Sequence, residues 1–173
     1  MIADVVIGLQ YGDEGKGKVT HQLARNGNYS HVLRFNGGCN AGHTIYHEGE
    51  KIITHHIPCG VILGIRSIIG PGCVVNFKKI MSEIKYLEGF GIDARKYLRI
   101  ASNVHVITDF HIAEDRKDED IGTTKTGNGP AYRDKYSRKG VLAMEIPELS
   151  DFIIDIFTVF HAIEEFDYIS VLC

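Results

Sequence analysis

A short stretch near the amino terminus combines glycines, lysines and a carboxylate in a spacing that could bind phosphate. The apolar run Val5–Ile7 leads into Gly8-Leu9-Gln10-Tyr11-Gly12-Asp13-Glu14-Gly15-Lys16-Gly17-Lys18. Glycines let the backbone bend until successive N–H groups point inward, and lysines add charge that phosphate oxygens would neutralise. The spacing from Gly12 to Gly17 and Lys18 fits the first seven positions of the P-loop pattern. We therefore predict a P-loop-like phosphate loop after the first strand. The alternative is a glycine-rich surface turn with scattered charges.

The loop departs from the P-loop pattern in its metal ligand. Its eighth position is Val19, so the hydroxyl that normally holds Mg²⁺ is missing. Asp13 lies inside the loop, where a carboxylate repels phosphate unless a cation intervenes or the carboxylate takes part in the reaction. Asp13 is therefore the candidate replacement ligand for a metal ion.

A second glycine-rich loop, Asn36-Gly37-Gly38-Cys39-Asn40-Ala41-Gly42-His43-Thr44, also follows a predicted strand. The Asn40 amide offers a donor and an acceptor, and Gly42 lets a ligand or a cation approach the backbone. His43 is a candidate general acid because the unperturbed pKa of histidine is near neutrality. We predict no such role for four other histidines, His55, His56, His105 and His111.

A third loop, Ile121–Pro130, contains paired threonines, a lysine and three glycines, and it is another candidate phosphate clamp. The charged stretch before it, Glu114–Asp120, is interpreted as solvated surface. The basic run Tyr132–Gly140 after it is predicted to lie on a helix. Such a run is usually only a solvated face. Beside a phosphate loop, however, it could direct an arginine to a nucleotide, including across a dimer interface.

Hydrophobic periodicity and turn residues predict alternating strands and helices. The predicted strands are Ile2–Leu9, His31–Phe35, Ser67–Ile69, Tyr97–Ala101, His105–Thr108 and Tyr168–Leu172, with a hairpin over 44–48 and 51–56. The predicted helices are Gly15–Arg25, a segment capped by Asn76 that ends near Gly89, and 148–165. The alternation predicts an α/β fold, a mostly parallel sheet with flanking helices. Ligands then collect at the carboxyl ends of the strands, where the glycine-rich loops lie.

Composition limits the classes of partner. The 173 residues fit one domain or one lobe of something larger, and a net charge of −3 argues against broad binding to nucleic acid or membrane surfaces. No apolar run is long enough to cross a membrane, and the amino terminus lacks the pattern of a signal peptide. The four cysteines have no C-x-x-C spacing and are predicted to be reduced thiols in a cytoplasmic protein.

Taken together, these motifs resemble the adenylosuccinate synthetase family. The resemblance covers nearly the whole chain, with four motifs in the family's order and at about its spacing. The motifs are Gly12–Lys18, Asn40–Thr44, His56–Gly60, and Ile121–Thr124 with Gly129–Tyr132. The resemblance implies a GTP-dependent ligation of aspartate to IMP that gives adenylosuccinate, with Mg²⁺ as cofactor. It also implies a homodimer in which Arg138 reaches the IMP phosphate of the neighbouring subunit.

The family's functional residues map onto this chain by position. The resemblance implies that Asp13 is the catalytic base, that His43 is the acid, and that Asp13 and the Gly42 backbone hold the metal ion. The implied GTP-binding residues are Gly12, Asp13, Glu14, Gly15, Lys16, Gly17, Lys18, Gly42, His43 and Thr44. The implied IMP-binding residues are Asp13, Glu14, Gly15, Lys16, Asn40, Ala41, Gly42, His43, Thr124 and Arg138.

Two departures from the family pattern leave alternatives open. Lys125-Thr126 replaces the commoner Gly-Arg, and family members are much longer than this chain. Residues 1–173 are therefore expected to be the amino-terminal part of a synthetase-like domain whose carboxyl-terminal part is absent. Tyr168–Leu172 should then be a central strand with an uncovered edge. The alternatives are a non-catalytic nucleotide-binding fragment and a synthetase for another 6-oxopurine nucleotide, such as dGMP. Asp13 favours IMP, because the phage enzymes that use dGMP tend to lack the loop aspartate.

Overall fold

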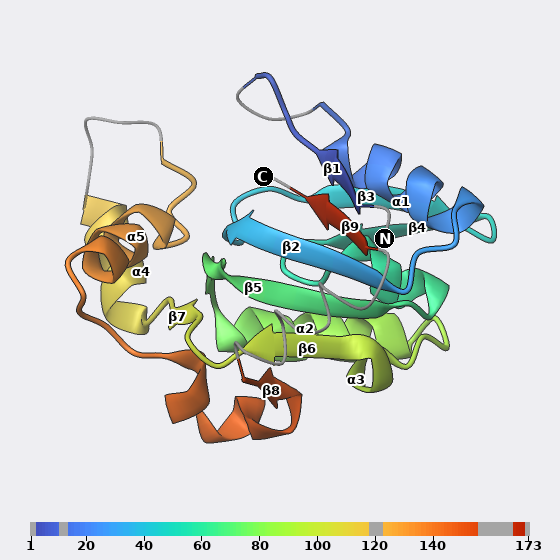
Figure 1. The fold of residues 1–173 in the computed structure, drawn as a ribbon. Coiled ribbons are helices and arrows are strands. Elements are labelled where there is room, and N and C mark those ends of the chain that lie inside the picture. The colour runs from blue at the N-terminus through green and yellow to red at the C-terminus, as the bar shows by residue number, and fades with distance from the viewer. Residues whose placement is uncertain (1–2, 11–13, 118–122, 156–167, 172–173) are drawn as a thin grey trace.

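The fold is built around one parallel sheet. The computed structural model of the chain describes residues 3–10, 14–117, 123–155 and 168–171 (Figure 1). Within this part of the chain, the strand order is β1-β9-β2-β5-β6-β8, with β7 paired to the far end of β5. All these pairings are parallel. The strands are β1 (Ala3–Val6), β2 (His31–Gly37), β5 (Arg66–Val75), β6 (Leu98–Ala101), β7 (His105–Val106), β8 (Ile153–Ile154) and β9 (Tyr168–Val171).

Helices and one hairpin complete the predicted α/β architecture. The helices are α1 (Lys16–Asn26), α2 (Phe77–Glu88), α3 (Ala94–Tyr97), α4 (Asp109–Lys117) and α5 (Asn128–Tyr136), and the antiparallel hairpin is β3 (His43–His47) with β4 (Glu50–Thr54). Short 3₁₀ segments span Cys59–Leu63, Ala143–Glu145 and Pro147–Phe152. In Figure 1, α2 passes behind the sheet, and α4 and α5 lie beyond the arrowhead of β2. The helical hairpin α4–α5 therefore stands at the carboxyl ends of the strands.

The helix after Asn76 follows its predicted pattern. The Asn76 side chain accepts a hydrogen bond from the Lys79 amide at 3.1 Å, which satisfies a donor that the first turn leaves free. Ile80, Ile84 and Leu87 are fully buried on one face of α2 and belong to the main core of the sheet. Spacing of three and four residues places these side chains together, so the sequence pattern was sufficient here.

Several element boundaries differ from the prediction: the first strand, predicted to reach Leu9, ends at Val6, and two other segments differ more. The strand expected to end at Ile69 continues as β5 through Gly70-Pro71-Gly72 to Val75. The β2–β5 register shifts between Arg34 and Asn36, and an irregularity of this kind accommodates a proline within a sheet. The helix predicted over 148–165 is wrong over 148–154, where a 3₁₀ turn leads into β8. Ile153 and Ile154 pair with β6, so sheet pairing overrides the helical periodicity, and 156–165 lie outside the described residues.

The last described strand corrects another expectation. β9 does lie inside the sheet, as predicted, but it pairs with β1 on one side and with β2 on the other. Both of its hydrogen-bonding edges are therefore covered, and the predicted open edge at Tyr168–Leu172 is wrong for 168–171. Among the described strands, β1 and β8 lie at the two ends of this strand order.

The irregularity in β5 gives a stability prediction. A Cβ at Gly72 would overlap the backbone carbonyl oxygen of Phe35, which cannot rotate away. We expect Gly72→Ala to lower the free energy of unfolding by roughly 1–3 kcal/mol, as overpacking does. Gly129→Ala in α5 is the control, because a Cβ there meets nothing within 4 Å. Urea denaturation measures both, and equal stability of the two variants would contradict the close approach of β2 and β5.

Candidate functional site

The first loop joins β1 to α1. Gly15 precedes the helix with φ of 75°, a left-handed conformation that favours glycine. Helix α1 begins at Lys16, so its first N–H groups and the positive end of its dipole face the loop. Gly12 and Asp13 lie outside the described residues, and their predicted roles stay predictions.

A carboxylate already engages donors of this loop. Glu14 accepts a hydrogen bond from the Lys16 ammonium at 2.7 Å and another from the Gln10 amide at 2.9 Å. The bond from Lys16, followed by that from Gln10, holds the pKa of Glu14 below its usual value. A lysine and a backbone amide are the donors expected for phosphate, so an incoming phosphate must compete with Glu14 for Lys16.

The second loop meets the first at His43. The imidazole packs directly on α1, where a Cβ at Gly17 would lie 2.9 Å from both Cβ and Nδ1 of His43. Glycine at this position of the helix therefore lets the imidazole lie against the end of the phosphate loop. This contact brings the two loops to one edge of the sheet, as the sequence predicted.

Arg34 connects the second loop to the exit of the β3–β4 hairpin. Its buried guanidinium donates to the Gly38 carbonyl at 2.6 Å, to the His56 carbonyl at 3.2 Å, and to the His55 carbonyl. Glu83 of α2 secures the same hairpin exit, because its carboxylate accepts from the His56 amide at 3.0 Å. Sequence reasoning missed Arg34. The available signal was a charged residue within the apolar strand His31–Phe35.

The third loop meets the second through Asn128. Its side-chain oxygen accepts from the Cys39 amide at 3.4 Å, and a Cβ at Gly38 would lie 2.8 Å from its side-chain nitrogen. Gly127, with φ of 80°, turns the third loop into α5, and its amide donates to the buried carboxylate of Asp115 at 2.8 Å. Asp115 is thus a structural cap, although the charged stretch that contains it was interpreted as solvated surface.

The surroundings of His43 change its protonation. Burial, followed by the positive charge of Arg34 and then that of Lys16, lowers the pKa of His43 to about 4. The pKa of His43 in this structure thus lies well below the unperturbed, near-neutral value on which the prediction of an acid role was based, and the imidazole is neutral at pH 7. A neutral imidazole still donates one hydrogen bond. Its role as an acid stays a prediction, and an anion bound nearby would support it by raising the pKa.

The remaining predicted residues differ in accessibility. Lys18, Asn40, Ala41, Gly42 and Thr124 are exposed, while Thr44 is half-buried. The Thr124 hydroxyl contacts the Thr126 hydroxyl at 2.9 Å. Arg138 is exposed just beyond α5, where its backbone has φ of 58° and its amide donates to the Lys135 carbonyl at 3.1 Å. The described contacts therefore join the three loops, but they do not bring Arg138 to them.

Two of the other histidines have structural roles. His56 Nε2 accepts a hydrogen bond from the Asn76 amide at 3.0 Å, and burial holds the pKa of His56 well below its usual value. His111 Nδ1 accepts from the Thr108 amide at 3.1 Å, and its Nε2 lies 3.2 Å from an Asp134 carboxylate oxygen. These contacts stabilise the start of α2 and the α4–α5 hairpin.

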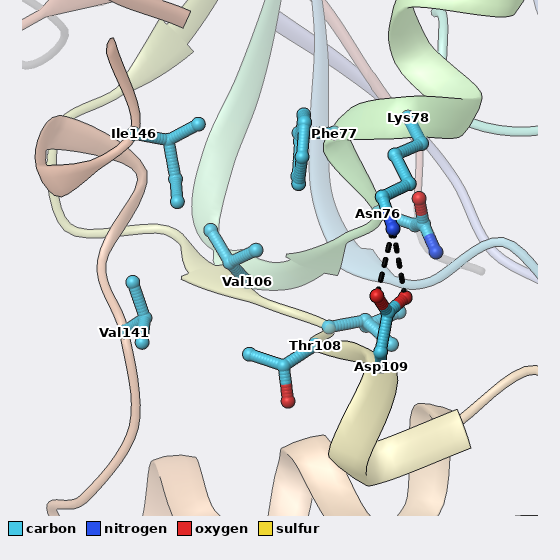
Figure 2. A pocket seen from close by; sticks show the side chains of 9 residues that line it. Asn76, Phe77, Lys78, Val106, Thr108, Asp109, Val141 and Ile146 are labelled. Atoms are coloured by element: carbon cyan, nitrogen blue, oxygen red, sulfur yellow. Dashed lines mark hydrogen bonds and ion pairs between the residues drawn. The ribbon is translucent and has the colours of Figure 1, made fainter. Parts of the chain in front are cut away.

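A separate cavity of about 240 Å³ opens between the start of α2 and the end of β7. Figure 2 shows Phe77, Val106, Val141 and Ile146 around it, and the Lys78 ammonium bonded to both Asp109 oxygens at 3.0 and 2.7 Å. No described residue of the three glycine-rich loops lines this cavity.

The described side chains do not form a complete metal site. No group of three or more His, Cys, Asp or Glu side chains in the described part of the chain could hold a metal ion by itself. The exposed backbone of Gly42 is accessible to a cation, and carbonyl oxygen suits Mg²⁺. Cys39, Cys59 and Cys73 are buried and form no disulfide within the described residues, while Cys173 lies outside them. Among the described helices, none has the length and apolar content of a membrane span.

Comparisons with known proteins point in one direction. The sequence profile of the family described as adenylosuccinate synthetase matches residues 5–165. Adenylosuccinate synthetase of Chlorobium chlorochromatii is 41% identical over 157 residues, and that of Listeria welshimeri is 43% identical over 159 residues. These alignments cover 86% and 88% of this chain, but 36% of each relative's length.

Solved structures show the same fold. Fully ligated adenylosuccinate synthetase of Plasmodium falciparum is similar with a TM-score of 0.81 at 28% identity, over 97% of this chain and 50% of that chain. Cyanophage S-2L succinoaminodeoxyadenylate synthetase, solved with dGMP and dATP as an energy donor, gives a TM-score of 0.82 at 23% identity. That alignment covers 98% of this chain and 50% of the phage enzyme, and it shows a shared fold alone.

The environment of His43 predicts an unusual titration. We expect its imidazole signals in NMR spectra, assigned by their loss in His43→Gln, to titrate near pH 4. Because this folded pKa lies below the reference value of 6.5, unfolding takes up protons between the two values. The contribution of neutral His43 to the free energy of unfolding is therefore complete above pH 6.5 and is lost as the pH falls toward 4. The free energy of unfolding of His43→Gln should consequently fall less over that range than that of the parent.

Added phosphate should raise the titration midpoint of His43, because an anion stabilises the imidazolium. Sodium chloride at the same ionic strength is the control for unspecific salt effects. A His43 midpoint between pH 6 and 7 without ligand would contradict its burial against α1 and the influence of the Arg34 charge.

Proposed function

Because this chain belongs to the adenylosuccinate synthetase family, we propose that it carries the phosphate-handling part of a GTP-dependent ligation of aspartate to IMP. The observation that supports this most directly is the meeting of three glycine-rich loops at one edge of a parallel sheet. His43 packs on Gly17, and Asn128 packs on Gly38 and binds Cys39. Phosphoryl transfer needs chiefly positioning and neutralisation of charge, which such an edge supplies.

In the proposed reaction, the Asp13 carboxylate accepts the proton from N1 of the hypoxanthine ring. The ring oxygen O6 then forms a bond to the γ-phosphorus of GTP as the bond to the β-phosphate breaks and GDP leaves. The neutral imidazole of His43 donates a hydrogen bond toward the transferred group. The amine of aspartate finally forms the bond to C6, and inorganic phosphate leaves with O6. Lys16, released from Glu14, and the loop amides hold phosphate oxygens.

Mg²⁺ fits the donors available to this site. The proposed protein ligands are the Asp13 carboxylate and the Gly42 carbonyl, which are hard oxygen donors. When bound, the ion would neutralise phosphate charge, and so relieve the repulsion that a carboxylate in a phosphate loop otherwise causes.

The proposed IMP contacts come from the second and third loops. Asn40 and Thr124 are exposed on loops that Asn128 holds together, so both side chains are accessible to one ligand. Arg138 is exposed at the far end of α5, which suits a contact with the IMP phosphate of a neighbouring subunit in a homodimer.

Nucleotide binding without turnover is the second candidate. The chain spans 36% of the length of the curated relatives that it matches. The family resemblance implies that complete turnover also requires groups that bind aspartate and guanine. The phosphate donors of α1 could operate without these groups. A nucleotide other than IMP, such as dGMP, is less well supported, because the likeness to the phage enzyme concerns fold alone and Asp13 favours IMP.

Asp13→Asn is the direct test of catalysis. In a preparation that turns over GTP and IMP, we expect the rate to fall about 10²–10⁴-fold, because a general base is lost. Circular dichroism and thermal unfolding should match those of the parent. Turnover within a few-fold of the parent at saturating GTP, IMP and Mg²⁺ would exclude the proposed role. A parent that binds GTP and IMP without turnover would support the second candidate instead.

Arg138→Leu tests the shared site. We expect a higher apparent KM for IMP with little change in that for GTP, because the lost charge would face only the IMP phosphate. Mixing Arg138→Leu with Asp13→Asn should restore part of the activity, since a hybrid dimer contains one intact site. Lys139→Leu, on the neighbouring exposed residue, is the control. If verified subunit exchange restores no activity, Arg138 does not act across the interface.

A further inference from the structure

The backbone of the second loop is fixed by side chains at three consecutive residues. The Gly37 amide donates to the Tyr132 hydroxyl at 2.8 Å, the Gly38 carbonyl accepts from Arg34 at 2.6 Å, and the Cys39 amide donates to Asn128 at 3.4 Å. These residues immediately precede Asn40. Two of the three side chains, those of Tyr132 and Asn128, come from α5. They lie 95 and 89 residues further along the chain than the amides that they bind.

Tyr132 makes a second bond that connects two strands. Its hydroxyl accepts from Gly37 at the end of β2 and donates to the Gly72 carbonyl of β5 at 3.1 Å. Burial is the main cause that raises the pKa of Tyr132 to about 12, so the phenol keeps its proton at neutral pH and can serve both partners. One hydroxyl therefore joins β2, β5 and α5 at the point where the β2–β5 register shifts.

A neighbouring contact fixes α5 on the same irregular segment. The Lys135 ammonium donates to the Pro71 carbonyl, one residue before the carbonyl that Tyr132 binds. Tyr132 and Lys135 lie three positions apart and therefore share one face of α5. At the other end of the helix, Asn128 holds the second loop and Gly127 closes the third. Because contacts at the start of α5 hold both loops, the helix links the third loop to the second.

We propose that Tyr132 and Asn128 are positioning residues that place Asn40, Gly42 and His43 for the ligand and couple this loop to the third loop. The proposal rests on the proposed function, in which these loops share the IMP site. Tyr132 does not touch the ligand. It acts by satisfying the Gly37 amide, which would otherwise have to find another partner.

The matched pair Tyr132→Phe and Tyr136→Phe tests the proposal. Both changes remove one phenolic oxygen from α5, and the two rings stack with centroids 6.1 Å apart. Tyr132 is half-buried at the loop, whereas Tyr136 is 79% exposed. Asn128→Asp is a second, conservative variant, because it keeps an oxygen that can accept from Cys39. Asn128→Leu removes that acceptor.

The first readout is amide hydrogen exchange, which needs no ligand. Tyr132→Phe should speed exchange at Gly37, Cys39 and Asn40 about tenfold, as loss of a hydrogen bond to a partly buried amide does. Asn128→Leu should act chiefly at Cys39, while Tyr136→Phe and Asn128→Asp should leave the loop near the parent value. Unchanged exchange at residues 37–40 in Tyr132→Phe would overturn the proposal, as would equal acceleration throughout the sheet.

The second readout separates the loops by their ligands. Tyr132→Phe should weaken IMP binding about 3- to 10-fold and leave the affinity for inorganic phosphate at the first loop unchanged. Equal weakening of both would indicate a general loss of structure and would overturn the positioning role. If the parent binds no IMP, the proposed function fails. Faster loop exchange in Tyr132→Phe would then still establish the anchor, and unchanged exchange would overturn it.

Discussion

The buried guanidinium of Arg34 is the interaction on which the candidate site most depends. It binds the carbonyls of Gly38, His56 and His55, and so fixes the second loop to the exit of the hairpin that begins at His43. The same positive charge helps to keep His43 neutral. One residue within an apolar strand thus sets both the position of the loop and the protonation of its histidine. Its removal would leave three carbonyls without this donor, two of them in buried contacts, which is costly in a protein interior.

Local patterns in the sequence were sufficient for the elements that bury one face. The period of α2, the Asn76 cap and the strands beside glycine loops could all be read from spacing, and the parallel sheet followed from their alternation. The continuation of β5 through Pro71 could not be read, because a shift in the partner strand accommodates the proline. The segment Ile153–Ile154 became a strand for a similar reason, since β6 offered it a partner. In the site, glycine spacing identified the loops, but the side chains that hold them act over long sequence separations. Tyr132 and Gly37 are 95 residues apart, a relation that no local pattern contains.

The positive charges at the first and second loops have different partners. At the first loop, Lys16 is neutralised by Glu14, so the local positive charge is partly masked until an anion displaces the carboxylate. At the second loop, Arg34 is held by carbonyl dipoles, and its charge lowers the pKa of His43. A phosphate that approaches both loops would therefore release Lys16 and favour protonation of His43 together. The two effects have the same sign, and both reduce the cost of bringing further negative charge to this edge.

The place of β9 has a consequence for how the chain acquires its shape. β1 and β2 are close in sequence, yet β9 lies between them and pairs with both. The loop between β1 and α1 therefore gains its final support only after residues 168–171 have been synthesised and inserted. Contacts between residues this far apart in the sequence slow folding, because the chain loses conformational entropy before the strand pairing compensates for it. On the ribosome, β1 would therefore emerge well before the strand that pairs with it, and its parallel pairing could form only once β9 had followed.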